Sequence, residues 1–143
     1  MFAYTLPFIK APQALSFIPI ASINISDCRQ ALGMENGAIS DAQIRASSIW
    51  DDNHAASQAR LNFKGGSKVG SWSAKTNDVQ QWLQVDLGSQ YAKVTRVGTQ
   101  GRDDDSQWVT KFKLQYGNDE ARLQFYKERG TNIDKVKKSH GLK

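Results

Sequence analysis

A strict alternation of side chains between residues 108 and 116 constrains this chain most. One set of alternate positions holds Trp108, Thr110, Phe112, Leu114 and Tyr116, and the other holds Lys111, Lys113 and Gln115. Because successive side chains of a strand point to opposite faces, this pattern predicts a half-buried antiparallel strand. Turn residues follow at 117–119, and the apolar Leu123 and Phe125 resume the alternation. The segment therefore predicts a β-hairpin.

Further short strands are predicted upstream of this hairpin. Leu83, Val85 and Leu87 share one face, and Gly88 follows them, while 94–99 predicts another strand. After Ala46 no run keeps apolar residues at helical spacing over several turns. Several short strands separated by turns indicate an all-β sandwich or barrel. A length of 143 residues suits one such domain.

The basic charge is concentrated near the C-terminus. The chain has 19 Lys and Arg against 14 Asp and Glu, a net charge of +5. Residues 127–143 hold six basic and two acidic groups and thus contribute +4 of that total. Nucleic-acid binding normally requires basic groups spread over a folded face. We therefore predict a basic tail over 127–143 and no nucleic-acid partner.

The sequence contains few residues that could form a catalytic site or a metal site. Cys28 is the single cysteine, so the chain can form neither an internal disulfide nor a cysteine-based zinc site. His54 and His140 are the two histidines, and no G-x-S-x-G motif occurs. The glycine-rich stretch 65–71 is followed by Trp72, without the lysine of a phosphate-binding loop. No enzyme is predicted.

The first 27 residues are apolar, and Lys10 is the only charge before Asp27. The charge-free span 11–26 is shorter than the roughly 18–20 residues of a membrane helix and contains two prolines. Segment 1–27 is instead predicted as a possible signal or leader peptide, although its positive charge follows the first apolar run. An extracellular or secreted location is therefore expected.

A series of motifs runs along the chain in a fixed order. It comprises Cys28, ALGMENGAISDAQI at 31–44, ASS at 46–48, ARLN at 59–62, Trp72, QWLQVDLG at 81–88, TQGR at 99–102 and WVT at 108–110. Together these motifs closely resemble the discoidin domain, also called the coagulation factor 5/8 C-type domain. The resemblance covers residues 28 to about 126.

This resemblance implies a distorted jelly-roll β-sandwich of the galactose-binding-domain-like class. Such domains are usually extracellular and non-enzymatic, and loops at one end bind carbohydrate, phospholipid, collagen or other proteins. In the family, the first and last cysteines join the ends of the domain. The sequence departs from that pattern after Tyr126, where the last strands and the closing cysteine are not found. We therefore expect a partial discoidin domain over 28–126, missing its last strands.

The resemblance also implies that two loops, 49–54 and 102–107, project as spikes and that loop 73–78 forms a third wall of the recognition surface. Five carboxylates lie on the spikes. An acidic tip is repelled by an anionic bilayer, so membrane phospholipid ranks below glycan or protein as a partner. The candidate ligand-binding residues are Trp50, Asp51, Asp52, Asn53, His54, Ser73, Asn77, Arg102, Asp103, Asp104 and Asp105. Calcium is the one cofactor that these residues suggest, with Asp103, Asp104 and Asp105 as its candidate ligands.

The predicted function is a non-catalytic extracellular module for cell adhesion or matrix attachment, which binds a glycan or a matrix or cell-surface protein. One alternative is the carbohydrate-targeting module of a larger secreted enzyme, and another is a phospholipid-binding module. A hydrolase would need paired carboxylates such as Asp51 and Asp104, one of them with a raised pKa. Trp72, Trp82 and Trp108 are expected to be structural, in the core or under a loop.

Overall fold

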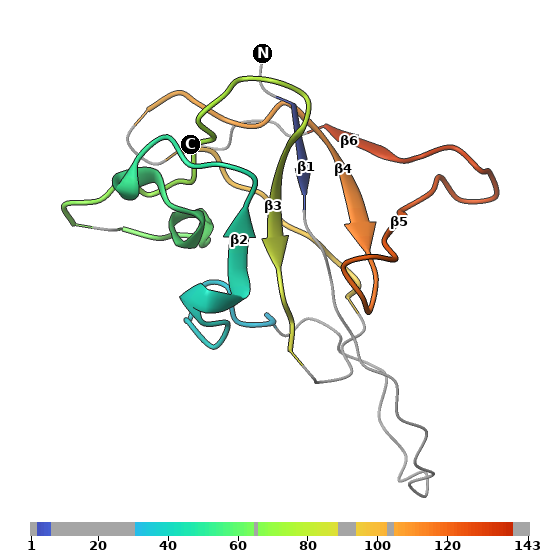
Figure 1. Ribbon diagram of the computed structural model, residues 1–143, viewed down its shortest axis with the longest axis horizontal. Coiled ribbons are helices and arrows are strands. Elements are labelled where there is room, and N and C mark those ends of the chain that lie inside the picture. The colour runs from blue at the N-terminus through green and yellow to red at the C-terminus, as the bar shows by residue number, and fades with distance from the viewer. Residues whose placement is uncertain (1–2, 7–30, 65, 89–93, 103–104, 139–143) are drawn as a thin grey trace, which may run out of the picture.

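The computed structural model describes residues 3–6, 31–64, 66–88, 94–102 and 105–138 (Figure 1). Strands form most of its regular structure, together with three short 3-10 helices. The strands are β1 Ala3–Leu6, β2 Ile44–Ala46, β3 Gln81–Val85, β4 Lys111–Tyr116, β5 Gln124–Phe125 and β6 Val136–Lys138. The 3-10 helices are η1 Asp41–Gln43, η2 Asp52–His54 and η3 Ala56–Ala59. The predicted all-β fold class is confirmed.

The strands lie in the order β2-β3-β1-β4-β5, and β6 also pairs with β4 (Figure 1). β2 runs antiparallel to β3, whereas β1 runs parallel to both β3 and β4. β5 and β6 each run antiparallel to β4. β1 therefore joins the β2–β3 pair to the strands around β4.

The predicted hairpin is present, but its first strand is shorter than expected. β4 begins at Lys111, and Phe112 is its buried residue, with 7% of its surface exposed. Trp108 precedes the strand and is 40% exposed. The turn needs Gly117, because a Cβ there would lie 2.9 Å from the carbonyl oxygen of Arg122. The alternation thus identified the strand and its turn, while its first three residues belong to a loop.

The predicted strand at 94–99 is wrong, because these residues form no strand in the structure. Val97 is 42% exposed, and its neighbours Thr95 and Arg96 are exposed as well. A segment with neither face buried gains little from sheet packing.

The hydrophobic core forms where β2 and β3 pair. Ile39, Ile44, Leu83 and Val85 make up its buried cluster. Ile44 lies opposite Val85 in the sheet, and Ala46 lies opposite Leu83. Gly33 closes the loop that carries Ile39, with a φ of +115° and no room for a Cβ, which would lie 2.7 Å from Cβ of Ala38. The core thus anchors the end of β2, from which the loop after Ala46 projects.

Both terminal segments contribute a strand. β1 comes from segment 1–27, and the rest of that segment, with Cys28, lies outside the described residues. β6 comes from 127–143, predicted as a basic tail, and pairs with β4 so that Lys137 lies opposite Phe112. Within the described residues, no helix is long and apolar enough to cross a membrane. The signal or leader peptide stays a prediction.

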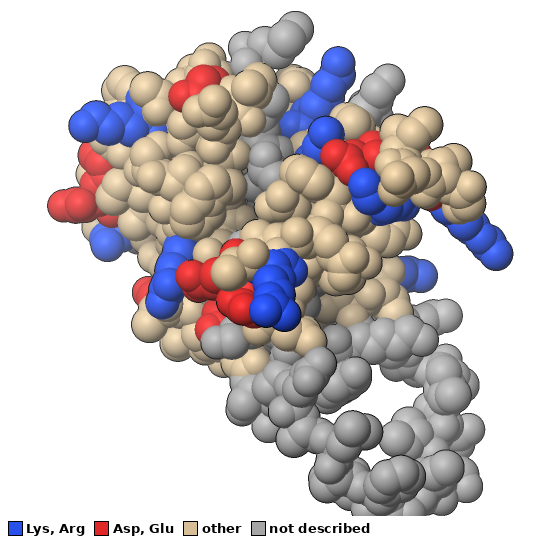
Figure 2. All heavy atoms as spheres, turned by 45° about the vertical axis from the view of Figure 1, so that its right-hand side comes forward, with Lys and Arg blue, Asp and Glu red and all other residues tan. Residues whose placement is uncertain are grey.

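The C-terminal segment is attached to β4 by an ion-pair network. Asp134 Oδ1 lies 2.9 Å from Nζ of Lys127, and its Oδ2 lies 3.1 Å from Nζ of Lys113. Lys135 pairs with Glu128 at 3.1 Å. Figure 2, turned so that the β5 and β6 side comes forward, shows acidic and basic groups next to one another on this side. Lys127 and Lys135 of this segment are thus paired with its two carboxylates.

We expect acidification to loosen this segment through Asp134. Hydrogen bonds from Lys127 and then Lys113 lower the pKa of Asp134. A carboxyl with a lowered folded-state pKa stabilises the fold above its unfolded pKa of about 3.9, and this contribution disappears as the pH falls through the folded value. Protection factors of the amides at 127–138, measured by hydrogen exchange, should therefore fall below about pH 4.

In Asp134→Asn this protection should be lower at neutral pH and should no longer fall with acid. Glu128→Gln, in the same segment, is the matched control and should keep the acid-dependent loss. An unchanged acid response in Asp134→Asn would contradict the assignment of this pH dependence to Asp134.

Candidate ligand-binding groove

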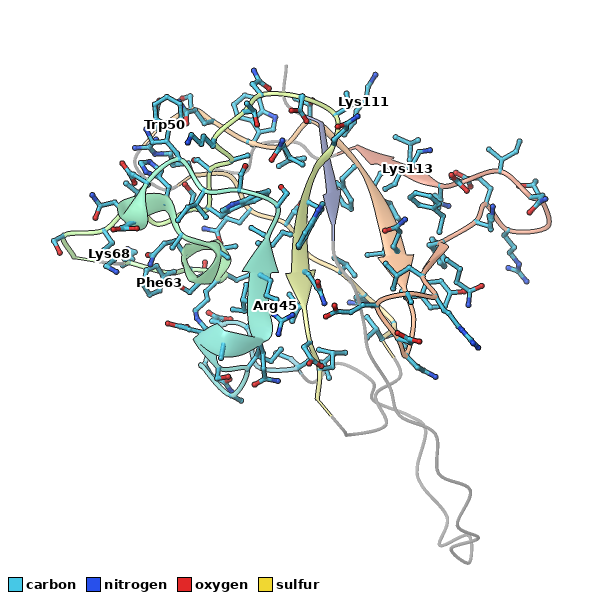
Figure 3. The ribbon with its side chains drawn as sticks, viewed as in Figure 1. Arg45, Trp50, Phe63, Lys68, Lys111 and Lys113 are labelled. Atoms are coloured by element: carbon cyan, nitrogen blue, oxygen red, sulfur yellow. The ribbon has the colours of Figure 1, made fainter. Side chains whose placement is uncertain are left out.

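A groove of about 380 Å³ lies where three loops converge. The loops come from 50–54, 71–77 and 100–109, and Figure 3 shows Trp50 at the end of the molecule towards which β2 runs. The lining residues are Trp50, His54, Ser71, Trp72, Ser73, Ala74, Lys75, Asn77, Gln100, Arg102, Gln107, Trp108 and Val109. These are the three loops at which the sequence predicts ligand recognition.

Backbone hydrogen bonds hold the first two loops together. The amide of Trp50 donates to the carbonyl of Ser73 at 2.8 Å, and the amide of Ser73 donates to the carbonyl of His54 at 3.3 Å. The amide of Lys75 donates to Oγ of Ser48 at 3.0 Å. These bonds do not depend on the side chains of Trp50, Ser73 or Lys75, which leaves those side chains available for a ligand.

Asp51 organises the first loop from outside the groove. Its Oδ1 accepts hydrogen bonds from the amides of Asn53 and His54, at 2.9 and 3.1 Å, and so caps η2. The same oxygen lies 2.7 Å from Nδ1 of His54. The bond from the His54 ring is the largest cause of a lowered pKa for Asp51. Because an ionised carboxylate only accepts, Nδ1 of His54 carries a proton.

Besides Trp50, two further tryptophans form part of the groove surface. Nε1 of Trp72 donates to the carbonyl of Ser48 at 2.8 Å, and its ring packs against the core cluster. Trp108 lies next to the base of the third loop. There the amide of Arg102 donates to the carbonyl of Gln107 at 2.8 Å, and Nη1 of Arg102 lies 3.3 Å from Oε1 of Gln107. The Trp72 ring is therefore held by its surroundings before any ligand binds.

Most of the chain matches the model of a known protein family. The family model described as "F5/8 type C domain" matches residues 43–142. The chain belongs to the F5/8 type C domain family. The match extends past Tyr126 and includes the part of 127–143 that forms β6. The resemblance found in the sequence is thus confirmed.

Relatives of this F5/8 type C domain include coagulation factor V of Mus musculus, 36% identical over 125 residues, covering 83% of this chain and 6% of the relative. The venom prothrombin activator pseutarin-C non-catalytic subunit of Pseudonaja textilis is 35% identical over 124 residues, 83% of this chain and 8% of the relative. The EGF-like repeat and discoidin I-like domain-containing protein 3 of Homo sapiens is 40% identical over 124 residues, 78% of this chain and 24% of the relative. The chain thus spans a small part of each.

The groove of this F5/8 type C domain brings together five of the predicted ligand-binding residues, namely Trp50, His54, Ser73, Asn77 and Arg102. Asp51, Asp52 and Asn53 do not line it. Asp105 is exposed outside it, with Oδ1 2.6 Å from the amide of Ser106. Asp103 and Asp104 lie outside the described residues. The part of the lining that the structure describes is therefore more aromatic and less acidic than expected.

Several residues that line the groove are not among the predicted ligand-binding residues. Trp72 and Trp108 were expected to be structural, and Trp72 does pack on the core while also lining the groove. Lys75, Gln100 and Gln107 were not selected, although they lie in or next to the predicted loops. Their positions in or next to those loops were the sequence signal that could have found them.

The described residues provide no grouped metal ligands, and Asp51 lacks the raised pKa that a hydrolase would need. Among the described residues, no three His, Cys, Asp or Glu side chains are grouped to hold a metal ion. A general acid needs a raised pKa, whereas the pKa of Asp51 is lowered. Asp51 therefore does not fit the role that a carboxylate-based hydrolase would give it.

Proposed function

We propose that this chain is a non-catalytic extracellular recognition module that binds a glycan of the matrix or the cell surface in its loop-end groove. The observation that carries the proposal is the groove lining, which combines three tryptophans with hydroxyl and amide groups. A relative described as a non-catalytic subunit agrees with a role in binding.

The lining supplies the two kinds of contact that a sugar needs. The rings of Trp50, Trp72 and Trp108 offer flat apolar surface for the C–H face of a sugar ring. The side chains of Ser73 and Asn77 can donate to and accept from sugar hydroxyls. The volume is at the lower end of the range of about 300–1,000 Å³ for small-ligand pockets, which suits the terminal residues of a glycan.

Two cations extend this chemistry to acidic sugars. Lys75 and Arg102 line the groove, and none of its described lining residues is an aspartate or glutamate. A carboxylate or sulfate on a sugar would form charge-assisted hydrogen bonds with these groups. We therefore propose that sialylated or sulfated glycans bind more tightly than neutral ones.

A glycan array tests the proposal directly. The full chain, applied with calcium and then with a chelator, is expected to be retained by a limited set of glycans in which acidic members predominate. Retention that survives the chelator would place recognition in the groove, and retention lost with the chelator would point to the acidic spike at 103–105. Retention by no glycan would overturn the proposal.

Phospholipid binding is the second candidate, and the exposure of Trp50 favours it. This side chain is 64% exposed, and an exposed tryptophan at a loop tip is suited to a membrane interface. Vesicles of phosphatidylcholine, with and without phosphatidylserine, form the second arm of the experiment. Cosedimentation with vesicles and no retention on the array would favour this candidate over glycan binding.

A further inference from the structure

We infer that Gln81, a buried residue of β3 outside the groove lining, is a positioning residue that fixes the separation of two groove walls. The inference rests on the proposed function for its consequence in binding. Its structural content, the attachment of two loops to one amide, can be tested without any ligand.

The amide of Gln81 bonds to two loops at once. Its Oε1 accepts hydrogen bonds from Oγ of Ser47 and Oγ of Ser48, both at 2.7 Å. Its Nε2 donates to Oγ1 of Thr76 at 3.1 Å and to Oδ1 of Asp78 at 3.0 Å. Because a carboxylate can only accept, Asp78 fixes which end of the amide carries the nitrogen.

These four bonds use the full capacity of the side chain. An amide oxygen has two lone pairs and an amide nitrogen has two hydrogens. Gln81 is 6% exposed, so water has little access to compete for either group. A fully satisfied buried network of this kind holds its members in one arrangement.

The network leads directly to residues that line the groove. Ser48 Oγ, which donates to Gln81, accepts the amide of Lys75 at 3.0 Å. The carbonyl of Ser48 accepts Nε1 of Trp72 at 2.8 Å. Thr76 and Asp78 belong to the loop that carries Lys75 and Asn77. Gln81 thus links the Ser48 side of the groove to the Lys75 side without lining the groove itself.

The chain offers a closely matched control on the same strand. Gln84 is also buried, at 8% exposed, and its Nε2 donates to Oε1 of Glu120 at 3.1 Å, away from the groove loops. Gln81→Met and Gln84→Met each replace a buried amide by an apolar side chain of similar length. The two variants therefore differ in which loops lose their attachment.

Hydrogen exchange on the full-length chain is the first measurement. In Gln81→Met the protection factor of the Lys75 amide is expected to fall about tenfold or more, as befits the loss of several buried hydrogen bonds. In Gln84→Met it should stay at the wild-type value. Equal protection of Lys75 in the two variants would overturn the inference.

Gln81→Glu gives a second test, which a general loss of packing would not reproduce. At neutral pH the new carboxylate would face the carboxylate of Asp78, and the two would repel each other. As the pH is lowered through the range where one of the pair takes up a proton, above about 4.3, a donor returns and the Lys75 amide should regain protection. A protection factor that fails to recover would contradict the inference even if Gln81→Met does not fold.

The third measurement is the affinity for an acidic glycan that retains the chain on the array. Gln81→Met should bind it about tenfold more weakly than wild type, and Gln84→Met as tightly as wild type. Wild-type affinity in Gln81→Met would overturn the positioning role. If wild type binds no glycan but the exchange results appear as expected, the proposed function fails while the link between the loops stands.

Discussion

Leu83→Ala is expected to lower the free energy of unfolding by about 2–5 kcal/mol, as found for buried Leu to Ala changes. Leu83 is 5% exposed and belongs to the buried cluster between β2 and β3. The substitution removes apolar contacts and leaves a cavity that the paired strands cannot fully close. Because single domains are stable by only about 5–15 kcal/mol, the effect should be visible as a large shift of the urea unfolding midpoint.

Ile133→Ala is the control for this substitution. Ile133 is 66% exposed, so removing its side chain should change the free energy of unfolding by no more than about 0.5 kcal/mol. Similar midpoints for the two variants would show that the cluster around Leu83 is not the core of the folded chain.

Trp50→Ala is expected to weaken glycan binding by about tenfold to a hundredfold, because tryptophans are the residues whose truncation most often costs binding energy. The variant should fold normally, since the side chain is 64% exposed. The backbone bond from residue 50 to Ser73 is retained by alanine, so the loop should keep its attachment. Titration calorimetry with an acidic glycan selected on the array measures the change.

Tyr126→Ala is the matched control, since Tyr126 is a large aromatic that is 45% exposed and does not line the groove. It should bind the glycan as wild type does. A loss of affinity shared by both variants would indicate that the groove is not the site, and an unchanged affinity in Trp50→Ala would remove this ring from it.

The alternation of side chains and the turn residues predicted the part of the fold in which neighbouring segments of the chain pair with each other. The alternation around Phe112 and the turn at Gly117 identified the β4–β5 hairpin, because strand pairing across a short turn depends on neighbouring residues. The places of β1 and β6 could not be predicted in this way. Their partners on β4 lie far away or across an irregular loop in the sequence, and nothing in the four residues of β1 specifies a parallel neighbour.

The candidate site was predicted at the level of loops and less well at the level of side chains. Asp51 was selected as a ligand-binding residue, but its position directly before a short helix is the position of a capping residue, and its bonds to His54 confirm that use. Trp72 is predicted from the sequence to be structural, because tryptophans beside strand patterns usually lie in the core or under a loop. A ring of that size can pack on the core with one part and face a groove with another.

β1 lies in the middle of the sheet, but it belongs to the segment that is predicted as a signal or leader peptide. Among the described strand pairings, the two parts of the sheet meet only through Ala3–Leu6. A leader peptidase that cleaved behind β1 would therefore remove the connecting strand and leave the backbone of Gln81–Trp82 and of Lys111–Leu114 without that neighbour. Maturation by cleavage and the present sheet are thus mutually exclusive, unless another segment takes the vacated position.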